Sequence, residues 1–391
     1  MKLIYITSYY NWVLREFYLS NPQLLSLEAS DQLQKLLDMR FAWSDVWKDA
    51  LNPLGYDVET IVFNAELIQK AWAQENGIQY NTESWRFEIL RAQIKFIQPD
   101  VIFLDDYSSF SSQQILSLKS TCARTKLIFG WCGAPYKTIE PFFGFDFIFS
   151  NISEIVSELS EAGVKVFHFK HAFDSRIHPS LKPDKFKSNH VSFSGSVDLR
   201  AGWHDERAVF LNLLASKVPI EIASSACFKI GSLSAIIARG FRLLSLNGFP
   251  VAPLNTCFKR VYNHDFHFVS ALKPPLIGQE MYDFMAHSVA TFNIHIGKSK
   301  GEAANMRLFE ASGIGACLLT DYSRSLENLF EPDSEVVTYA SQEECLEKAQ
   351  WLIENPSRAF EIGQNARKRV LSEHTFHHRA TDLHQIIGRY I

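Results

Sequence analysis

The sequence predicts an α/β protein made of two Rossmann-like, doubly wound domains. Its 391 residues are more than one hydrophobic core normally organises. Short β-rich runs alternate with helical stretches, which is the pattern of parallel sheets covered by helices on both faces. The alternation restarts after a polar, proline-marked stretch at 178–189, which we interpret as the linker between the domains.

The first domain is expected to span residues 1–172. Its predicted strands are Leu3–Thr7, Val58–Phe63, Val101–Leu104, Lys126–Phe129, Phe145–Ser150 and Val166–Phe169. Its predicted helices cover 28–39, 84–97, 112–121 and 152–162. The last of these has apolar residues at helical spacing and stops at Gly163, a residue suited to a helix C-cap.

The second domain is expected to span residues 183–374. Its predicted strands are Val191–Ser194, Pro219–Ala223, Val289–Ile294, Ala316–Thr320 and Val336–Tyr339. Residues 225–277 fit a strand, a loop or an insertion, and the sequence leaves these alternatives open. No strand is expected after the last of these, and a final helix at 375–391 is expected to pack back on the first domain.

The composition excludes several classes of protein. The net charge is −4 with no long basic block, which argues against nucleic acid as a partner. No run of 18 apolar residues is present, so we expect no transmembrane segment. The six cysteines show no CxxC pair or metal-ligand spacing, and we interpret them as reduced core thiols of a cytoplasmic protein. They are Cys122, Cys132, Cys227, Cys257, Cys317 and Cys345.

The most informative motif, GKSKGEAANMRLFEASGIG (297–315), follows a predicted strand. Gly297 and Gly301 allow tight turns, and Lys298 and Lys300 add positive charge before a helix expected to begin near Ala303. Free backbone N–H groups and the helix dipole favour phosphate at such an N-terminus. The motif therefore predicts an anion site.

Glu302 and Glu310 form an E-x7-E spacing in the same motif. On one helix they would lie roughly 12 Å apart, about the span from a ribose to a sugar across a pyrophosphate. Glu310 would then accept hydrogen bonds from a ribose diol and Glu302 from the hexose. On this hypothesis Glu310→Ala should weaken nucleotide binding and leave the fold nearly intact. The alternative is that both are solvated helix carboxylates, with Glu310 paired to Arg307.

A second loop, FSGSVDLRAGWHDER (193–207), follows the first strand of the second domain. Gly195 and Ser196 allow close backbone approach, and Arg200, His204 and Arg207 are candidate phosphate ligands. The loop lacks the GxGxxG pattern, so it does not indicate a nicotinamide cofactor. The alternative interpretation is a polar turn with solvent-facing arginines.

Five segments follow one another along the chain: VSFSGS (191–196), GQEMYDFMAHSVATFNIH, ANMRLFEASGIGACLLTD, LENLFEPDSEVVTYAS and RVLSEHTFHHRA. In this order they resemble the CgeB-like (spore-protein-like) branch of the group 1 glycosyltransferases. The segment at 145–179 fits as well. This resemblance implies a GT-B fold, in which two Rossmann-like domains face each other across a cleft.

The resemblance also implies the partners and the site. The second domain would hold a nucleotide-diphosphate-sugar donor and the first a glycan, protein or small-molecule acceptor, with no cofactor and no metal required. Glu310 would contact the ribose and Glu302 the sugar, and transfer would retain the anomeric configuration. No clear Arg…Lys-Gly pair is present, so Arg200, Arg207 and Lys298 remain competing diphosphate ligands. The other donor-binding candidates are Gly195, Ser196, Gly301, Ala303, Ala304, Asn305 and Arg307.

The first domain offers weaker signals after its strands. Aromatic residues there could stack on an acceptor sugar, and Asp106 would be the base if the reaction inverts. The acceptor-side candidates are Tyr10, Asn11, Trp12 and Trp131. The alternative for Asp105 and Asp106 is that they cap the helix that follows.

Other functions remain as alternatives. A catalytically silent nucleotide- or sugar-binding protein could keep the same scaffold, and so could another GT-B enzyme such as a nucleotide-sugar epimerase. His374, His377 and His378 share a helical spacing but lack the other ligands of a metal site. The basic run 367–369 is interpreted as a solvated face, with peripheral membrane contact as the alternative.

Overall fold

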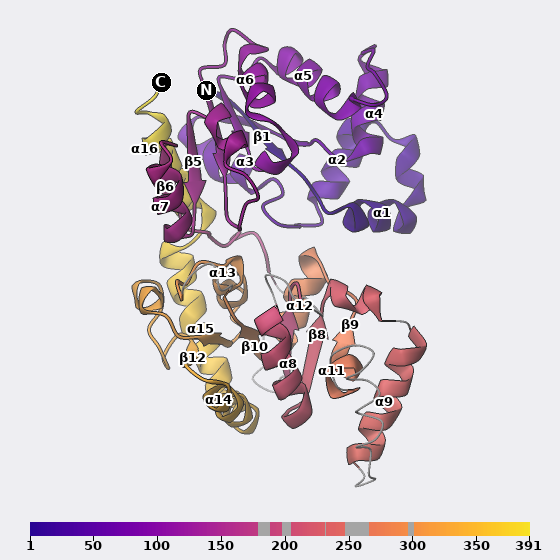
Figure 1. Cartoon of the computed structure of the whole chain (residues 1–391), viewed down its shortest axis with the longest axis vertical. Helices are drawn as coiled ribbons and strands as arrows, with labels where there is room; N and C mark the ends of the chain where they lie inside the picture. The colour runs from indigo at the N-terminus through magenta and orange to yellow at the C-terminus, as the bar shows by residue number, and fades with distance from the viewer. Residues whose placement is uncertain (179–187, 198–204, 231, 247–265, 296–300) are drawn as a thin grey trace. The chain divides into compact units, whose positions relative to one another are not determined.

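A computed structural model of the chain describes residues 1–178, 188–197, 205–230, 232–246, 266–295 and 301–391. The chain divides into two compact units (Figure 1). Unit 1 comprises Met1–His171 together with Phe376–Ile391, and unit 2 comprises Ala172–Thr375.

Unit 1 is built on a six-stranded parallel sheet in the order β2-β1-β3-β4-β5-β6. The strands are β1 (Lys2–Thr7), β2 (Asp57–Val62), β3 (Val101–Leu104), β4 (Leu127–Trp131), β5 (Phe147–Ser150) and β6 (Val166–His168). The helices are α1 (Asn11–Ser20), α2 (Ala29–Leu37), α3 (Val46–Leu51), α4 (Glu66–Glu75), α5 (Trp85–Ile97), α6 (Ser112–Ser120), α7 (Ser153–Glu161) and α16 (Phe376–Ile387). Every residue of β3, β4 and β5 is buried, because helices cover both faces of a parallel sheet.

The C-terminal helix α16 packs within unit 1, against α3 (Figure 1). Its first residue, Phe376, places its ring 5.2 Å from that of Trp47 and 5.9 Å from that of Trp43. Nδ1 of His384 lies 3.0 Å from the Tyr56 hydroxyl. The two ends of the chain therefore contribute to one core.

Unit 2 has a second six-stranded parallel sheet, in the order β12-β11-β10-β7-β8-β9. The strands are β7 (Ser188–Ser194), β8 (Ile220–Ala223), β9 (Leu272–Lys273), β10 (Ser288–Asn293), β11 (Leu318–Asp321) and β12 (Val337–Tyr339). The helices are α8 (Asp205–Lys217), α9 (Ser232–Leu246), α11 (Phe266–Ala271), α12 (Gly278–His287), α13 (Met306–Gly313), α14 (Gln342–Glu354) and α15 (Pro356–Glu373). The predicted fold class, two doubly wound α/β domains, is confirmed.

Within the stretch that the sequence left open, the structure resolves η5 (Ser225–Lys229), α9, α11 and the two-residue strand β9, and residues 247–265 lie outside the described ranges. β9 pairs with β8 at the edge of the second sheet. A strand of two residues is too short to show the period-2 pattern that identifies strands in a sequence.

The predicted start of the helix near Ala303 is wrong. Helix α13 begins at Met306, and its N-cap residue, Asn305, has extended backbone dihedrals (φ −87°, ψ 157°). The amide of Ala303 donates instead to the Ser325 hydroxyl, at 2.8 Å. The preceding residues therefore approach the helix as an extended segment held by its surroundings.

Strand order reverses once in each sheet. In unit 1 the reversal lies between β1 and β3, and in unit 2 between β7 and β10. Ligands of open α/β sheets bind beyond the carboxyl ends of the strands at such positions. A ligand-binding site is therefore expected at one or both of these reversal points.

The structure gives information on the expectations about membrane-spanning segments and cysteines. Among the described residues, no helix is both long and apolar enough to cross a bilayer. Five cysteines in the described ranges are free thiols, and four of them are buried. Cys257 lies outside those ranges.

Candidate functional site

At the reversal point of unit 2, the carboxyl ends of β7 and β10 are joined by one side chain. Arg207, on α8, donates from Nη1 to the carbonyl of Ser196 at 3.2 Å and from Nη2 to the carbonyl of Ile294 at 3.3 Å. The Gly195 amide donates to the carbonyl of Ala223 on β8, at 3.1 Å. Arg207 thus links two strand ends, and its role as a phosphate ligand stays a prediction.

The N-terminus of α13 meets the same edge of the sheet. Asn305 makes no side-chain capping bond to the helix, so the N-cap residue itself leaves the first-turn N–H groups of α13 uncapped. Its Nδ2 donates instead to Oδ1 of Asn293, at the end of β10, at 2.7 Å. Gly301, which precedes this turn, has a φ of +76° that favours glycine. An uncapped helix N-terminus of this kind suits a phosphate group.

Glu310 is a buried member of an ion pair. Its side chain is only 9% exposed, and Oε2 lies 2.9 Å from Nη1 of Arg307. Oε1 lies 3.4 Å from the hydroxyl of Tyr282, on α12. Burial, followed by the charge of the Glu310 carboxylate, raises the pKa of Tyr282 well above its usual range, so this phenol stays a donor. The pairing with Arg307 is as the alternative interpretation expected, but the pair is enclosed and not solvated.

Arg307 holds three elements together. Besides Glu310, it donates from Nη2 to the carbonyl of Ser194 at 3.0 Å, and Nη1 approaches the sulfur atoms of Met281 and Met285. Its guanidinium is therefore engaged with the end of β7 and with α12. Arg307 therefore supports the site through these contacts, and its role in donor binding stays a prediction.

Glu302 does not lie on the same helix as Glu310, contrary to the prediction from the E-x7-E spacing. Glu302 precedes α13 and lies outside any helix, with Ala303 and Ala304 buried after it. The helical rise that would separate the two glutamates by about 12 Å does not apply to this extended segment. The E-x7-E spacing thus pairs a loop carboxylate with a buried helix carboxylate.

Several predicted residues fall outside the described ranges. They are Arg200, His204, Gly297, Lys298 and Lys300. Among the described candidates, Ser196 is exposed at the strand end and Gly195 is half-buried beside it. The structure thus brings Ser196, Arg207, Asn305 and Arg307 to one edge of the sheet.

At the reversal point of unit 1, Asp106 serves as a cap. Its two oxygens accept from the amide and hydroxyl of Ser108 and from the hydroxyls of Ser8 and Ser109, at 2.7–3.0 Å. It caps the 3-10 turn Tyr107–Ser109, whereas α6 is capped by Ser111. Four internal donors occupy the carboxylate, which agrees with the capping alternative, and the role of general base stays a prediction.

The neighbouring Asp105 has a different environment. It accepts from the hydroxyl of Tyr5 at 2.9 Å and of Thr7 at 3.0 Å. Burial of the carboxyl raises its pKa to about 6, although these two hydrogen bonds act in the opposite direction. The sequence did not separate the roles of these two adjacent aspartates.

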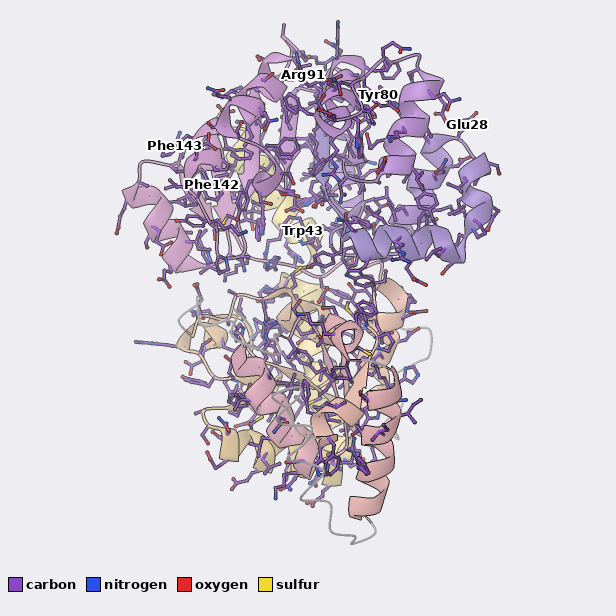
Figure 2. The ribbon with its side chains drawn as sticks, turned by 45° about the vertical axis from the view of Figure 1, so that its right-hand side comes forward. Glu28, Trp43, Tyr80, Arg91, Phe142 and Phe143 are labelled. Atoms are coloured by element: carbon purple, nitrogen blue, oxygen red, sulfur yellow. The ribbon has the colours of Figure 1, made fainter. Side chains whose placement is uncertain are left out.

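The acceptor-side candidates divide into surface and core residues. Tyr10 is 61% exposed and stacks on Trp12 at 6.4 Å, and Asn11 beside them is exposed. Trp131 is only 7% exposed, with its ring 4.7 Å from that of Trp43, a buried residue labelled in Figure 2. The prediction that Trp131 stacks on an acceptor is therefore wrong, because other rings cover it.

The structure also bears on metal binding. Among the residues that the structure describes, no group of three or more His, Cys, Asp and Glu side chains is arranged to hold a metal ion. His374 lies in unit 2, where it packs against Phe309, whereas His377 lies in unit 1, 3.3 Å from Asp49.

Comparison with known proteins identifies the architecture. A family model described as glycosyl transferase-like matches residues 249–385, and no curated protein matches the chain in sequence. Solved structures match over the whole chain, each at low identity. HepE from Anabaena, in complex with UDP-glucose, has a TM-score of 0.57 and 10% identity over 100% of both chains. Sucrose-phosphate synthase from Thermosynechococcus elongatus has a TM-score of 0.55 and 10% identity, over 100% of this chain and 98% of the other. The lipopolysaccharide outer core galactosyltransferase WaaB has a TM-score of 0.52 and 12% identity over 100% of both chains.

The fold is GT-B. Within it, the sequence analysis missed a set of polar side chains at the ends of β10 and β11. Asn293 ends β10 and His295 follows it closely, and Thr320 and Asp321 end β11. Nδ1 of His295 lies 2.7 Å from Oδ1 of Asp321. The signal was present in NIH and LLTD, because the carboxyl ends of neighbouring parallel strands meet at one edge of a sheet.

Proposed function

We propose that this chain is a glycosyltransferase that moves a sugar from a nucleotide-diphosphate-sugar donor, held by unit 2, to a glycan, protein or small-molecule acceptor. One observation carries the proposal. The uncapped N-terminus of α13 lies at the strand-order reversal of the second sheet, within the segment that matches the glycosyl transferase-like model. Both features favour an anionic, phosphate-bearing ligand at this edge.

The donor would lie along this edge with its diphosphate at the first turn of α13. Ser196 and Gly195 border the position from β7, and Asn305 from the helix. Glu310 would accept the ribose hydroxyls, and Glu302, in the preceding segment, would face the transferred sugar. Binding of UDP-glucose by HepE supports a nucleotide-sugar donor on this fold. We propose no metal for the reaction.

We further propose that the anomeric configuration is retained. An inverting mechanism needs a base that removes the proton of the acceptor hydroxyl. The candidate for that role, Asp106, already accepts four hydrogen bonds from its own loop. The carboxylate would have to give up one of these bonds to take a proton from an acceptor hydroxyl. Proton NMR of the first-formed product would decide between retention and inversion.

A nucleotide-release assay tests the main proposal. Wild type would be incubated with a panel of nucleotide-diphosphate sugars, with and without candidate acceptors, and free nucleotide diphosphate measured. We expect release that increases with an acceptor. Binding without release would indicate a silent binding protein, and conversion of the donor sugar without release would indicate an epimerase. Either result would contradict the proposal.

A matched pair of variants connects the activity to the site. Glu310→Gln removes the charge of the buried pair with Arg307, whereas Glu361→Gln does the same in an exposed i,i+3 pair with Arg358. We expect nucleotide affinity to fall at least tenfold in the first, because bonds to a charged acceptor contribute about 1.5–3 kcal/mol. The second should match wild type. Equal affinities would remove Glu310 from the donor site.

A further inference from the structure

A continuous chain of hydrogen bonds crosses the candidate site beneath the N-terminus of α13. It runs from the His295 ring to Asp321 (2.7 Å), from Asp321 to the Thr320 hydroxyl (3.2 Å) and from there to Asn293 Nδ2 (2.9 Å). Asn293 Oδ1 then meets Asn305 Nδ2 at 2.7 Å. This chain of hydrogen bonds therefore joins the ends of β10 and β11 to the N-cap of α13.

Each end of this chain leaves one buried atom without a partner. Nε2 of His295 and Oδ1 of Asn305 are both buried and make no hydrogen bond within the described ranges. The His295 side chain is only 2% exposed. Buried polar atoms are nearly always bonded, so two open ends on one network indicate a missing ligand or water.

The Asp321 carboxylate determines the donor and the acceptor of every hydrogen bond in this series. The Asp321 carboxylate only accepts, so the Thr320 hydroxyl donates to it and must itself accept from Asn293 Nδ2. Asn293 then presents Oδ1 to the Asn305 amide, which leaves Asn305 Oδ1 as an acceptor. A reversed amide would set two oxygen atoms against each other.

The Asp321 carboxylate also determines which nitrogen of the His295 ring carries a hydrogen. Asp321 accepts from the backbone amide of His295 at 3.1 Å and 3.2 Å as well as from its ring. Nδ1 must therefore carry the hydrogen, and in the neutral ring Nε2 holds a lone pair. Both open ends of the chain are thus acceptors.

We propose that His295 Nε2 and Asn305 Oδ1 are acceptors that bind sugar hydroxyl groups of the donor. This inference rests on the proposed function and assigns part of its donor site. Phosphate oxygens accept hydrogen bonds and cannot satisfy either atom, whereas sugar hydroxyls donate to both. The hydroxyl groups belong to the ribose of the nucleotide or to the transferred sugar.

Calorimetric titration of His295→Asn tests the pair. An asparagine amide reproduces the Nδ1 donor to Asp321 and removes the Nε2 acceptor, so the internal chain survives. His384→Asn, the same change in α16 of unit 1, is the control. The titrants are UDP and UDP-glucose, or the best-bound nucleotide and its sugar from the panel above.

We expect His295→Asn to bind about threefold to tenfold more weakly, with an unchanged melting temperature, because one neutral hydrogen bond is lost. Weaker binding of both titrants identifies the ribose, and weaker binding of the nucleotide sugar alone identifies the transferred sugar. Affinities equal to wild type for both titrants overturn the inference and leave the proposed function standing. A wild type that binds nothing in the panel overturns both.

A second measurement is independent of the donor. Nitrogen-15 NMR of the histidine rings, with the His295 signals assigned by their loss in His295→Asn, reports which ring nitrogen carries the proton. The inference requires a proton on Nδ1 and a lone pair on Nε2. A doubly protonated ring would make Nε2 a donor suited to phosphate, and would overturn the assignment to hydroxyl groups.

Discussion

The surroundings of Glu310 change the expected effect of replacing it. On the sequence alone, Glu310→Ala is expected to leave the fold nearly intact. The structure places the carboxylate in an enclosed pair with Arg307, with 9% and 15% of the two side chains exposed. Loss of one member leaves the other charge buried and uncompensated. The loss of stability and the loss of binding must therefore be measured separately.

We predict that Glu310→Ala lowers the free energy of unfolding of unit 2 by about 2–4 kcal/mol. Glu361→Ala breaks an exposed pair of the same i,i+3 geometry and should change it by less than about 1 kcal/mol. Amide hydrogen exchange across α13 and β10 would measure the effect, because it resolves one unit in a two-domain chain. Similar exchange in the two variants would show that the pair does not stabilise the fold.

Asp105 gives a prediction that depends on pH. Burial raises the pKa of its carboxyl to about 6, above the value of about 3.9 for an unfolded chain. The folded state thus binds more protons between these values, and stability falls as pH rises through this window. Since the residue is only partly buried, we expect a loss of about 1–2 kcal/mol between pH 4 and pH 7.

Asp105→Asn should remove this loss. The neutral amide can still accept from Tyr5 or Thr7, so the variant should be more stable than wild type at pH 7 and about equal to it at pH 4. Melting temperatures across that range would test the sign. A variant that is less stable at pH 7 would show that the ionised carboxylate is favoured in the folded state.

At the scale of elements, long apolar strands were predictable and boundaries set by distant contacts were not. The runs that form β3 and β10 are buried at every residue, and such runs are visible in a sequence. The start of α13 was placed three residues early, although asparagine at 305 is a favoured N-cap residue. The bonds that extend the preceding segment come from Asn293 and Ser325, which lie on other elements.

Close packing also constrains helix α13 at its last residue, Gly313. A Cβ atom added at Gly313 would lie 2.3 Å from the ring of Phe173, in the segment where the chain enters unit 2. We predict that Gly313→Ala destabilises unit 2 by about 1–3 kcal/mol through this clash. Gly240→Ala, in α9, meets nothing within 4 Å and should be neutral or stabilising, since alanine favours helix.

Melting temperatures of these two variants and of Gly313→Ala/Phe173→Leu would test the contact. The smaller side chain at position 173 should recover part of the lost stability. A double variant no more stable than Gly313→Ala would place the cause elsewhere in α13.

At the scale of the whole molecule, α16 completes unit 1. We predict that Phe376→Ala destabilises that unit by about 3 kcal/mol, because the ring is 5% exposed and packs on Trp47. Phe143→Ala in the same unit removes a ring that is 53% exposed, labelled in Figure 2, and should cost far less. Hydrogen exchange should accelerate in β1 and β3 and stay unchanged in β7. Faster exchange in both units would contradict a local effect.

The packing of α16 also has a consequence for synthesis on the ribosome. Phe376 emerges about 200 residues after His171, so the rest of unit 1 is complete in sequence well before its last helix exists. At translation rates of about 5–20 residues per second, this interval lasts roughly 10–40 s. During that time Trp43 and Trp47 lack a ring that covers them in the finished protein. A nascent chain of this protein thus presents an aromatic surface that a ribosome-associated chaperone could bind until translation ends.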